Sequence, residues 1–127
     1  MPKPTDLLAP CPGTPNCVST LAAGRYRIDP IPYRGTPAAA RERLLAVLRD
    51  LPLTRIVRQE PHYLHAECRT LLLRYVDDVE FVFDDRAAVI QFRSASRTGY
   101  YDLGVNRRRM ETIHRRYLSQ APGVSDR

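Results

Sequence analysis

Four strand-like runs follow one another between two helical segments, and this order constrains the fold more than any other feature of the chain. In the second run, Leu64, Ala66 and Cys68 alternate with polar residues, which is the period of a strand with one buried face. The four runs cover residues 54–60, 63–70, 71–84 and 87–96. Because short turns join strands that are antiparallel neighbours, the pattern predicts an antiparallel four-stranded meander sheet.

Each flanking segment has the period of an amphipathic helix. Thr36-Pro37 is a helix start signal, a hydroxyl cap followed by proline, and Pro52 ends the segment that follows. The predicted buried stripe of this first helix is Ala40, Leu44, Val47, Leu48 and Leu51. The predicted buried side of the last helix is Leu103, Asn106, Met110, Ile113, His114 and Tyr117, opposite Arg108, Thr112, Arg115 and Arg116. We therefore expect an α+β fold with an N-terminal and a C-terminal helix packed on one face of the sheet.

The length of 127 residues fits one domain. We expect an extended, proline-rich arm over residues 1–35, the α-β-β-β-β-α domain over 36–118, and a flexible tail over 119–127. No apolar run approaches the ~20 residues of a membrane span, and the first residues lack the apolar core of a secretory signal. The expected location is therefore the cytoplasm.

Three cysteines are present, and a reducing compartment would keep all of them as thiols. Cys11 and Cys17 are near enough in sequence to touch, and Cys68 is expected in the core. The three histidines do not complete a zinc site with them. We expect no metal and no cofactor.

The hairpin formed by the third and fourth strands has a register that can be argued. If Asp84 faces Ala87 across a two-residue turn, three facing pairs fall on one side of the sheet: Val79 with Phe92, Phe81 with Ile90, and Phe83 with Ala88. Asp78 would then face Arg93, and Glu80 would face Gln91, on the other side. Because Asp85-Arg86 is a poor dipeptide for such a turn, a longer loop is the alternative.

Three stretches of the chain carry a resemblance to a known family. They are residues 11–19 (CPGTPNCVS), 76–81 (VDDVEF) and 93–107 (RSASRTGYYDLGVNR). Together they resemble the signature stretches of the bacterial and plastid family called domain of unknown function 1499, over about residues 8–118. The chain departs from the expected pattern at Thr14, Thr20 and Tyr101. The resemblance implies no activity and no catalytic residue.

The stretch 93–107 concentrates guanidinium groups, hydroxyl groups and glycines between a strand and a helix, where arginines and backbone N–H groups can hold an anion. The alternative is structural: Arg93 and Arg97 pair with neighbouring carboxylates and only fix the corner. A metal site at the acidic cluster is not expected, because alternation points Asp77 away from Asp78 and Glu80. The candidate ligand-binding residues are Asn16, Cys17, Asp77, Asp78, Glu80, Arg93, Ser94, Ser96, Arg97, Tyr101, Asp102, Asn106 and Arg107.

The start of the last helix bears on the anion hypothesis. If Asn106 caps the helix, three arginines (107–109) occupy its first turn, where the helix dipole disfavours cations and a bound anion would offset the cost. If the helix starts at Asp102, these arginines are interior and no anion is needed. Both alternatives fit the sequence.

The leading hypothesis is a non-enzymatic domain that binds a small anionic ligand or an acidic protein partner at the strand-to-helix corner. One alternative is a small hydrolase-like enzyme that uses Asp77, Arg93, Ser96 and Asp102 around one pocket. Another is a weak nucleic-acid binder that uses the arginine-rich last helix. Nucleic acid is not the expected partner, because the aromatic interleaving of a single-strand binder is missing, with Tyr100 and Tyr101 as its only candidates.

Overall fold

The computed structural model of the chain describes residues 3–13, 15–70, 75–98 and 102–120. Its helices are α1 (Pro4–Leu7), the 3-10 helix η1 (Gly24–Tyr26), α2 (Pro37–Arg49) and α3 (Val105–Ser119). Its strands are β1 (Cys17–Ser19), β2 (Ile31–Pro32), β3 (Thr54–Glu60), β4 (Tyr63–Arg69), β5 (Val76–Asp84) and β6 (Val89–Ser96). The fold is α+β with an antiparallel sheet, as predicted.

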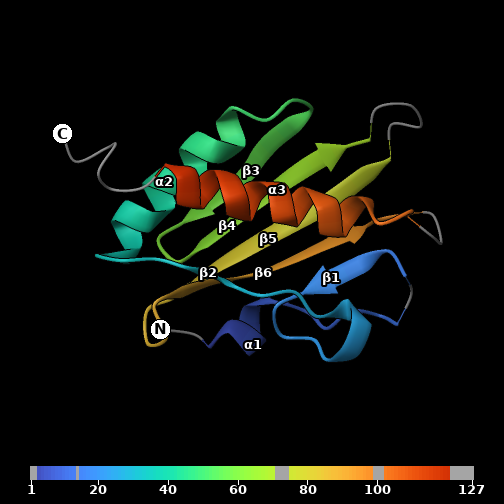
Figure 1. Cartoon of the computed structure of the whole chain (residues 1–127), viewed down its shortest axis with the longest axis horizontal. Coiled ribbons are helices and arrows are strands. Elements are labelled where there is room, and N and C mark those ends of the chain that lie inside the picture. The colour runs from blue at the N-terminus through green and yellow to red at the C-terminus, as the bar shows by residue number, and fades with distance from the viewer. Residues whose placement is uncertain (1–2, 14, 71–74, 99–101, 121–127) are drawn as a thin grey trace.

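The sheet has six strands, so the prediction of four was wrong in this detail. The meander β3-β4-β5-β6 is as expected, and β1 and β2 of the N-terminal arm both pair antiparallel with β6. In Figure 1 this arm runs along the outer edge of β6, beside α3. The arm strands are only 3 and 2 residues long, too short to show a strand period in the sequence.

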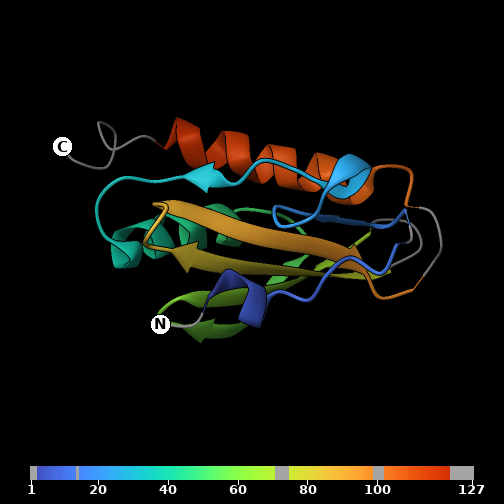
Figure 2. The same cartoon turned by 90° about the horizontal axis from the view of Figure 1, so that it is seen from below.

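One face of the sheet is covered by two long helices and the other by one short helix. In Figure 2, α2 and α3 lie on one side of the strands and the short α1 lies on the other. The main core lies under α2 and α3, and a small second cluster of Leu8, Tyr63 and Val82, with Leu7 packed against it, lies where α1 meets the sheet. Of the described helices, none combines the length and the apolar character that crossing a membrane requires.

Sequence signals close to each helix predicted the two long helices, α2 and α3. The Thr36 hydroxyl accepts a hydrogen bond from the backbone N–H of Ala39 at 3.0 Å, which confirms the predicted cap of α2. In α3, Asn106, Met110, Ile113 and Tyr117 are buried as predicted. Leu103 was placed wrongly on the buried side: it precedes the helix, has a φ of 56° and is 70% exposed.

The register of the β5–β6 hairpin differs from the predicted one by two residues. Phe81 faces Phe92, and Phe83 faces Ile90, because the turn takes the longer form and spans residues 85–88. Glu80 therefore faces Arg93, and Asp78 faces Ala95, in place of the predicted Arg93. A shift by an even number keeps each side chain on its face, so Val79, Phe81, Phe83, Ile90 and Phe92 are all fully buried together. Ala88, the sixth predicted member, lies in the turn and is exposed.

Candidate functional site

The predicted site residues of β5 and β6 do come together, but the sheet divides them. Residues that face each other across an antiparallel pair share a face, so Asp77 and Ser96 lie with Ser94 on the side of α3. Asp78, Glu80, Arg93 and Arg97 alternate with them and lie on the opposite side. Two separate polar clusters result.

On the α3 side, a buried ion pair fixes the helix to the sheet. The Asp77 carboxylate, 1% exposed, accepts a hydrogen bond from Arg109 Nη2 at 2.6 Å. Arg109 also donates to Asn106 Oδ1 at 2.9 Å and to Ser94 Oγ at 3.3 Å. The other carboxylate oxygen of Asp77, Oδ1, is buried and has no hydrogen-bond partner in the described part of the chain. Arg109 was not among the predicted site residues, although its spacing of three residues from Asn106 puts the two on neighbouring positions of one helix face.

Asn106 joins three separate segments at the same place. It is fully buried, and its Nδ2 donates to the backbone carbonyl of Asn16 at 3.1 Å, to Ser96 Oγ at 3.0 Å and to Asp102 Oδ2 at 2.8 Å. Its Oδ1 accepts from Ser94 Oγ at 2.6 Å. The side chain thus links the arm, the strand β6 and the start of α3. Five predicted site residues, Asn106 and its four partners, meet here through hydrogen bonds that hold the corner together.

The helix α3 starts at neither of the two predicted positions. Gly104, with a φ of 78°, is the N-cap, and Asn106 lies inside the first turn. Asp102 Oδ1 accepts from the N–H of Gly104 at 2.8 Å, and Oδ2 accepts from the N–H of Asn106 at 3.1 Å. Because a carboxylate at a helix N-terminus offsets the dipole, Asp102 supplies the negative charge that we expected from a bound anion.

On the other face, the predicted arginines pair with carboxylates. Arg97 donates to both oxygens of Asp78, at 2.7 and 2.8 Å, and to Glu67 at 2.6 Å, while His65 Nε2 lies 2.8 Å from Asp78. Burial opposes ionisation of Asp78, but the hydrogen bonds from Arg97 and His65 outweigh it and lower the pKa of that carboxyl. The hydrogen bond from Arg97 also lowers the pKa of Glu67.

The neighbouring cluster on this face is centred on Glu80. It accepts a hydrogen bond from the Tyr63 hydroxyl, and Arg93 Nη1 lies 3.7 Å from its other oxygen. Burial and this hydrogen bond raise the pKa of Tyr63. The geometry of Arg93 and Arg97 therefore fits the structural alternative, in which both are held by ion pairs.

The four residues of the hydrolase hypothesis do not converge on one point. Arg93 lies on the opposite face of the sheet from Asp77 and Ser96. Asp77 is paired with Arg109, and Asp102 holds the start of α3. The expected catalytic pocket is not formed by this set. Tyr101, another predicted site residue, lies outside the described residues.

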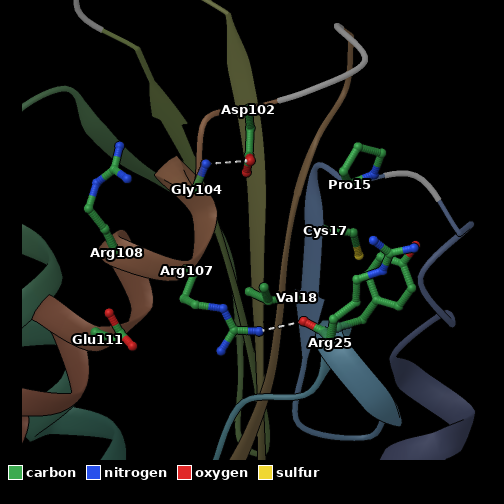
Figure 3. A pocket seen from close by; sticks show the side chains of 10 residues that line it. Pro15, Cys17, Val18, Arg25, Asp102, Gly104, Arg107, Arg108 and Glu111 are labelled. Atoms are coloured by element: carbon green, nitrogen blue, oxygen red, sulfur yellow. Dashed lines mark hydrogen bonds between the residues drawn. The ribbon is translucent and has the colours of Figure 1, made fainter.

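Another pocket opens beside the start of α3. It has a volume of about 310 Å³ and lies between the helix and the arm. Figure 3 shows Arg107 in this opening, with Cys17 and Arg25 across from it. The residues lining it are Pro15, Cys17, Val18, Arg25, Tyr26, Asp102, Gly104, Arg107, Arg108 and Glu111. Of the predicted site residues, Cys17, Asp102 and Arg107 are here; Arg25 was missed because nothing in the sequence relates residue 25 to residue 107.

Backbone carbonyl groups hold Arg107, and an aromatic ring lies beneath Arg25. Arg107 Nη2 donates to the backbone oxygens of Arg25 at 2.7 Å and Arg27 at 3.0 Å, and the first of these bonds is drawn in Figure 3. The guanidinium of Arg25 lies over the Tyr26 ring, 5.6 Å from its centroid. Neither arginine has a carboxylate within ion-pair distance among the described residues, so carbonyls and an aromatic ring orient both charges without neutralising them.

A disulfide bond closes a loop of the arm beside this pocket, which Cys17 lines. Cys11 and Cys17 are bonded, so the expectation of three thiols was wrong, and Cys68 is the free cysteine, buried as predicted. The Tyr26 hydroxyl donates to the carbonyl of Gly13, inside the closed loop, at 2.9 Å. The loop is thereby attached to η1, which carries Arg25. Within the described ranges, no group of three or more His, Cys, Asp or Glu side chains could hold a metal ion.

The fold and these clusters define a small α+β domain with a disulfide-closed arm and an arginine-lined pocket. The chain matches the model of the family described as "Protein of unknown function (DUF1499)" over residues 7–116. It belongs to that family, as its three signature stretches indicated. Neither the curated proteins nor the solved structures gave a match.

Proposed function

We propose that this protein is a non-enzymatic binding domain for a small polyvalent anion, such as a phosphate or a carboxylate compound, in the pocket between the arm and the start of α3. The observation that carries the proposal is the pair of guanidiniums at one opening, Arg25 and Arg107, with no carboxylate partner in the described structure. Guanidinium groups bind such anions through short, charge-assisted hydrogen bonds.

The rigidity of the pocket walls supports the same function. One wall is α3, fixed to the sheet by the buried Asp77–Arg109 pair and by Asn106. The other wall is the arm, closed by the disulfide and joined to Asn106 through the carbonyl of Asn16. Two walls held in place before binding reduce the entropy that a ligand must overcome. The pocket volume of about 310 Å³ lies at the lower end of the range for small-molecule sites, which favours a compact ligand.

The nucleic-acid alternative has less support. The exposed face of α3 carries Arg108, Arg115 and Arg116, as predicted, but Arg116 lies 3.7 Å from Asp50 of the α2 C-terminus. A nearby carboxylate weakens the attraction of this face for phosphates. The hydrolase alternative lacks its convergent pocket, so we do not develop it.

The location in the cell is part of the proposal. The cytoplasm expected from the sequence would keep Cys11 and Cys17 reduced. A disulfide that closes one wall of the binding pocket favours an oxidising compartment, and we propose that the protein works there. The free thiol of Cys68 is compatible with this, because it is 4% exposed.

Titration calorimetry with inorganic phosphate, pyrophosphate and citrate tests the binding proposal, with thermal unfolding as a second measurement. At least one of these anions should bind and raise the melting temperature. The exposed Arg25→Ala change should weaken binding about tenfold, the effect of losing a charge-assisted hydrogen bond of ~1.5 kcal/mol. Arg115→Ala, on the same molecule but away from the pocket, is the matched control. No binding by any of the three anions, or equal losses in both variants, would refute the proposal.

A further inference from the structure

A second cleft opens on the other side of α3 and is chemically different. It lies between the first half of α3, the turn from α2 to β3, and the end of β4, with a volume of about 440 Å³. In Figure 1 this turn and the arm lie on opposite sides of α3. The residues lining the second cleft are Leu51, Pro52, Thr54, Cys68, Arg69, Val105, Arg108, Arg109 and Thr112.

The polar groups deepest in this cleft are already paired. Cys68 Sγ lies 3.6 Å from the Thr54 hydroxyl, and burial raises the pKa of the Cys68 thiol, so the sulfur is neutral. The charge of Arg109 is balanced by the buried Asp77 at 2.6 Å. These groups need no ligand, and they give the cleft a neutral, largely apolar base.

Two further arginines in the lining are not balanced. Arg69 and Arg108 are both exposed, and neither has a carboxylate within ion-pair distance in the described part of the chain. Arg108 donates to the carbonyl of Leu103 at 2.7 Å and lines both openings, and Figure 3 shows its side chain pointing away from Cys17. The cleft lining contains no acidic residue, whereas the first pocket contains Asp102 and Glu111. The lining of the second cleft therefore carries no negative charge that would oppose an anionic head group.

Apolar side chains from two elements complete the lining. Leu51 and Pro52 come from the turn between α2 and β3, and Val105 comes from the first turn of α3. A ligand that satisfies both kinds of surface has an anionic head and an apolar body, because burying the body against these side chains releases water and the head neutralises an arginine. A compact inorganic anion would leave the apolar part empty.

We propose that this second cleft is a binding site for an amphipathic monoanion, a carboxylate on a short hydrocarbon body, with Arg69 and Arg108 holding the head. Arg108 lines both openings, but Arg69 lines only the second cleft and Arg25 lines only the first, so a variant at each of these two arginines tests one site without altering the other.

The chain contains a built-in reporter for this cleft. It has three cysteines, two of which form the disulfide, so Cys68 is the thiol left to react in the oxidised protein. Iodoacetamide alkylates a thiolate with loss of iodide, and the rate at Cys68 depends on access through the cleft it lines. A ligand in the cleft should therefore slow alkylation.

The experiment measures Cys68 alkylation by mass spectrometry with and without octanoate. We expect octanoate to slow the reaction at least threefold, and octylammonium and inorganic phosphate to have no such effect. Arg69→Ala should raise the octanoate concentration needed for protection about tenfold, as one lost charge-assisted contact of ~1.5 kcal/mol implies. Arg25→Ala is the matched control and should leave protection unchanged.

A second measurement keeps the test decisive if Cys68 reacts too slowly to follow. Octanoate should shift the methyl resonances of Leu51 and Val105 in a heteronuclear NMR spectrum and leave those of Val18, in the first pocket, unchanged. The proposal is overturned if these methyl groups do not shift, if octylammonium protects as well as octanoate, or if Arg69→Ala has no effect. Phosphate binding at Arg25 could still occur in each of these cases.

Discussion

At the scale of single residues, alternation along β5 decides what each acidic side chain can do. Asp77 and Asp78 are adjacent in sequence, yet one is buried against α3 and the other faces Arg97 on the far side of the sheet. The sequence argument that Asp77 points away from Asp78 and Glu80 is therefore confirmed. Which arginine pairs with which carboxylate could not be predicted, because Arg109 reaches Asp77 from an element 32 residues away.

The Arg97 cluster makes stability depend on pH. Arg97 holds Asp78 and Glu67, and the pKa of each carboxyl is lowered in the folded protein. A carboxyl whose folded pKa is lowered stabilises the fold above its unfolded pKa of ~4, and this contribution is lost as the pH falls through the folded pKa. Arg97→Gln should therefore be less stable than the wild type at pH 6, and the difference should shrink below pH ~4. Urea unfolding at both pH values measures it.

The control for this prediction is Arg115→Gln. Arg115 is exposed on α3 and has no carboxylate partner in the described structure, so its replacement should change stability equally at both pH values. A constant difference between Arg97→Gln and the wild type from pH 6 to pH 3 would contradict the assignment of the pH dependence to this cluster.

At the scale of elements, strong local signals predicted α2, α3 and the four strands of the meander. The Thr36 cap, the helical stripes and the alternation in β4 each depend on residues close in sequence. The strands of the arm were missed because 3 and 2 residues cannot show a period, and their pairing with β6 is a long-range contact. The start of α3 was also missed, because Gly104 ends up as the N-cap through the side chain of Asp102.

Gly104 offers a test of how the start of α3 is built. Its φ of 78° is left-handed, and a Cβ there would lie 2.9 Å from Arg108 Nη1. Gly35 has a φ of 79°, but a Cβ there would meet no atom within 4 Å. Each Gly→Ala change should lower the free energy of unfolding by about 1 kcal/mol, because alanine disfavours the left-handed backbone. Gly104→Ala should also displace the flexible Arg108 guanidinium from its hydrogen bond to the carbonyl of Leu103, a small additional loss. Urea unfolding of the two variants compares them directly.

The same pair of variants separates stability from binding. Displacing Arg108 should weaken octanoate protection of Cys68 in Gly104→Ala, whereas Gly35→Ala should retain it. If the two variants are equally destabilised and octanoate slows Cys68 alkylation equally in both, Arg108 does not occupy the position that the second cleft requires.

At the scale of the whole molecule, the arm completes a domain that the meander alone would leave open. It adds β1 and β2 to the outer edge of β6 and forms a wall of the anion pocket. Asn16 and Cys17 were named among the candidate site residues, and in the structure the Asn16 carbonyl accepts from Asn106 while Cys17 faces Ala95 of β6. Both residues are more than 70 positions from β6 in the sequence, so no local sequence pattern could have shown that they contact this strand.

The disulfide is the covalent part of this arrangement, and its removal gives the last prediction. Cys11 and Cys17 are six positions apart, and closing so short a loop stabilises a fold by ~2 kcal/mol through the unfolded chain. Cys11→Ser/Cys17→Ser should lose about this much in urea unfolding, and a reductant should destabilise the wild type but not this variant. Because the loop also holds η1 through Tyr26, the variant should bind anions more weakly at Arg25.

The state of these cysteines in the cell decides between the two compartments. Protein taken from its native source and alkylated under denaturing conditions should carry one label, on Cys68, if it works in an oxidising compartment. Three labels would mean that the loop is open where the protein functions, and the pocket would then have a wall held only by the hydrogen bonds of Asn106 and Tyr26. The proposed anion site needs the closed loop, so the label count tests the location and the rigidity of the pocket at once.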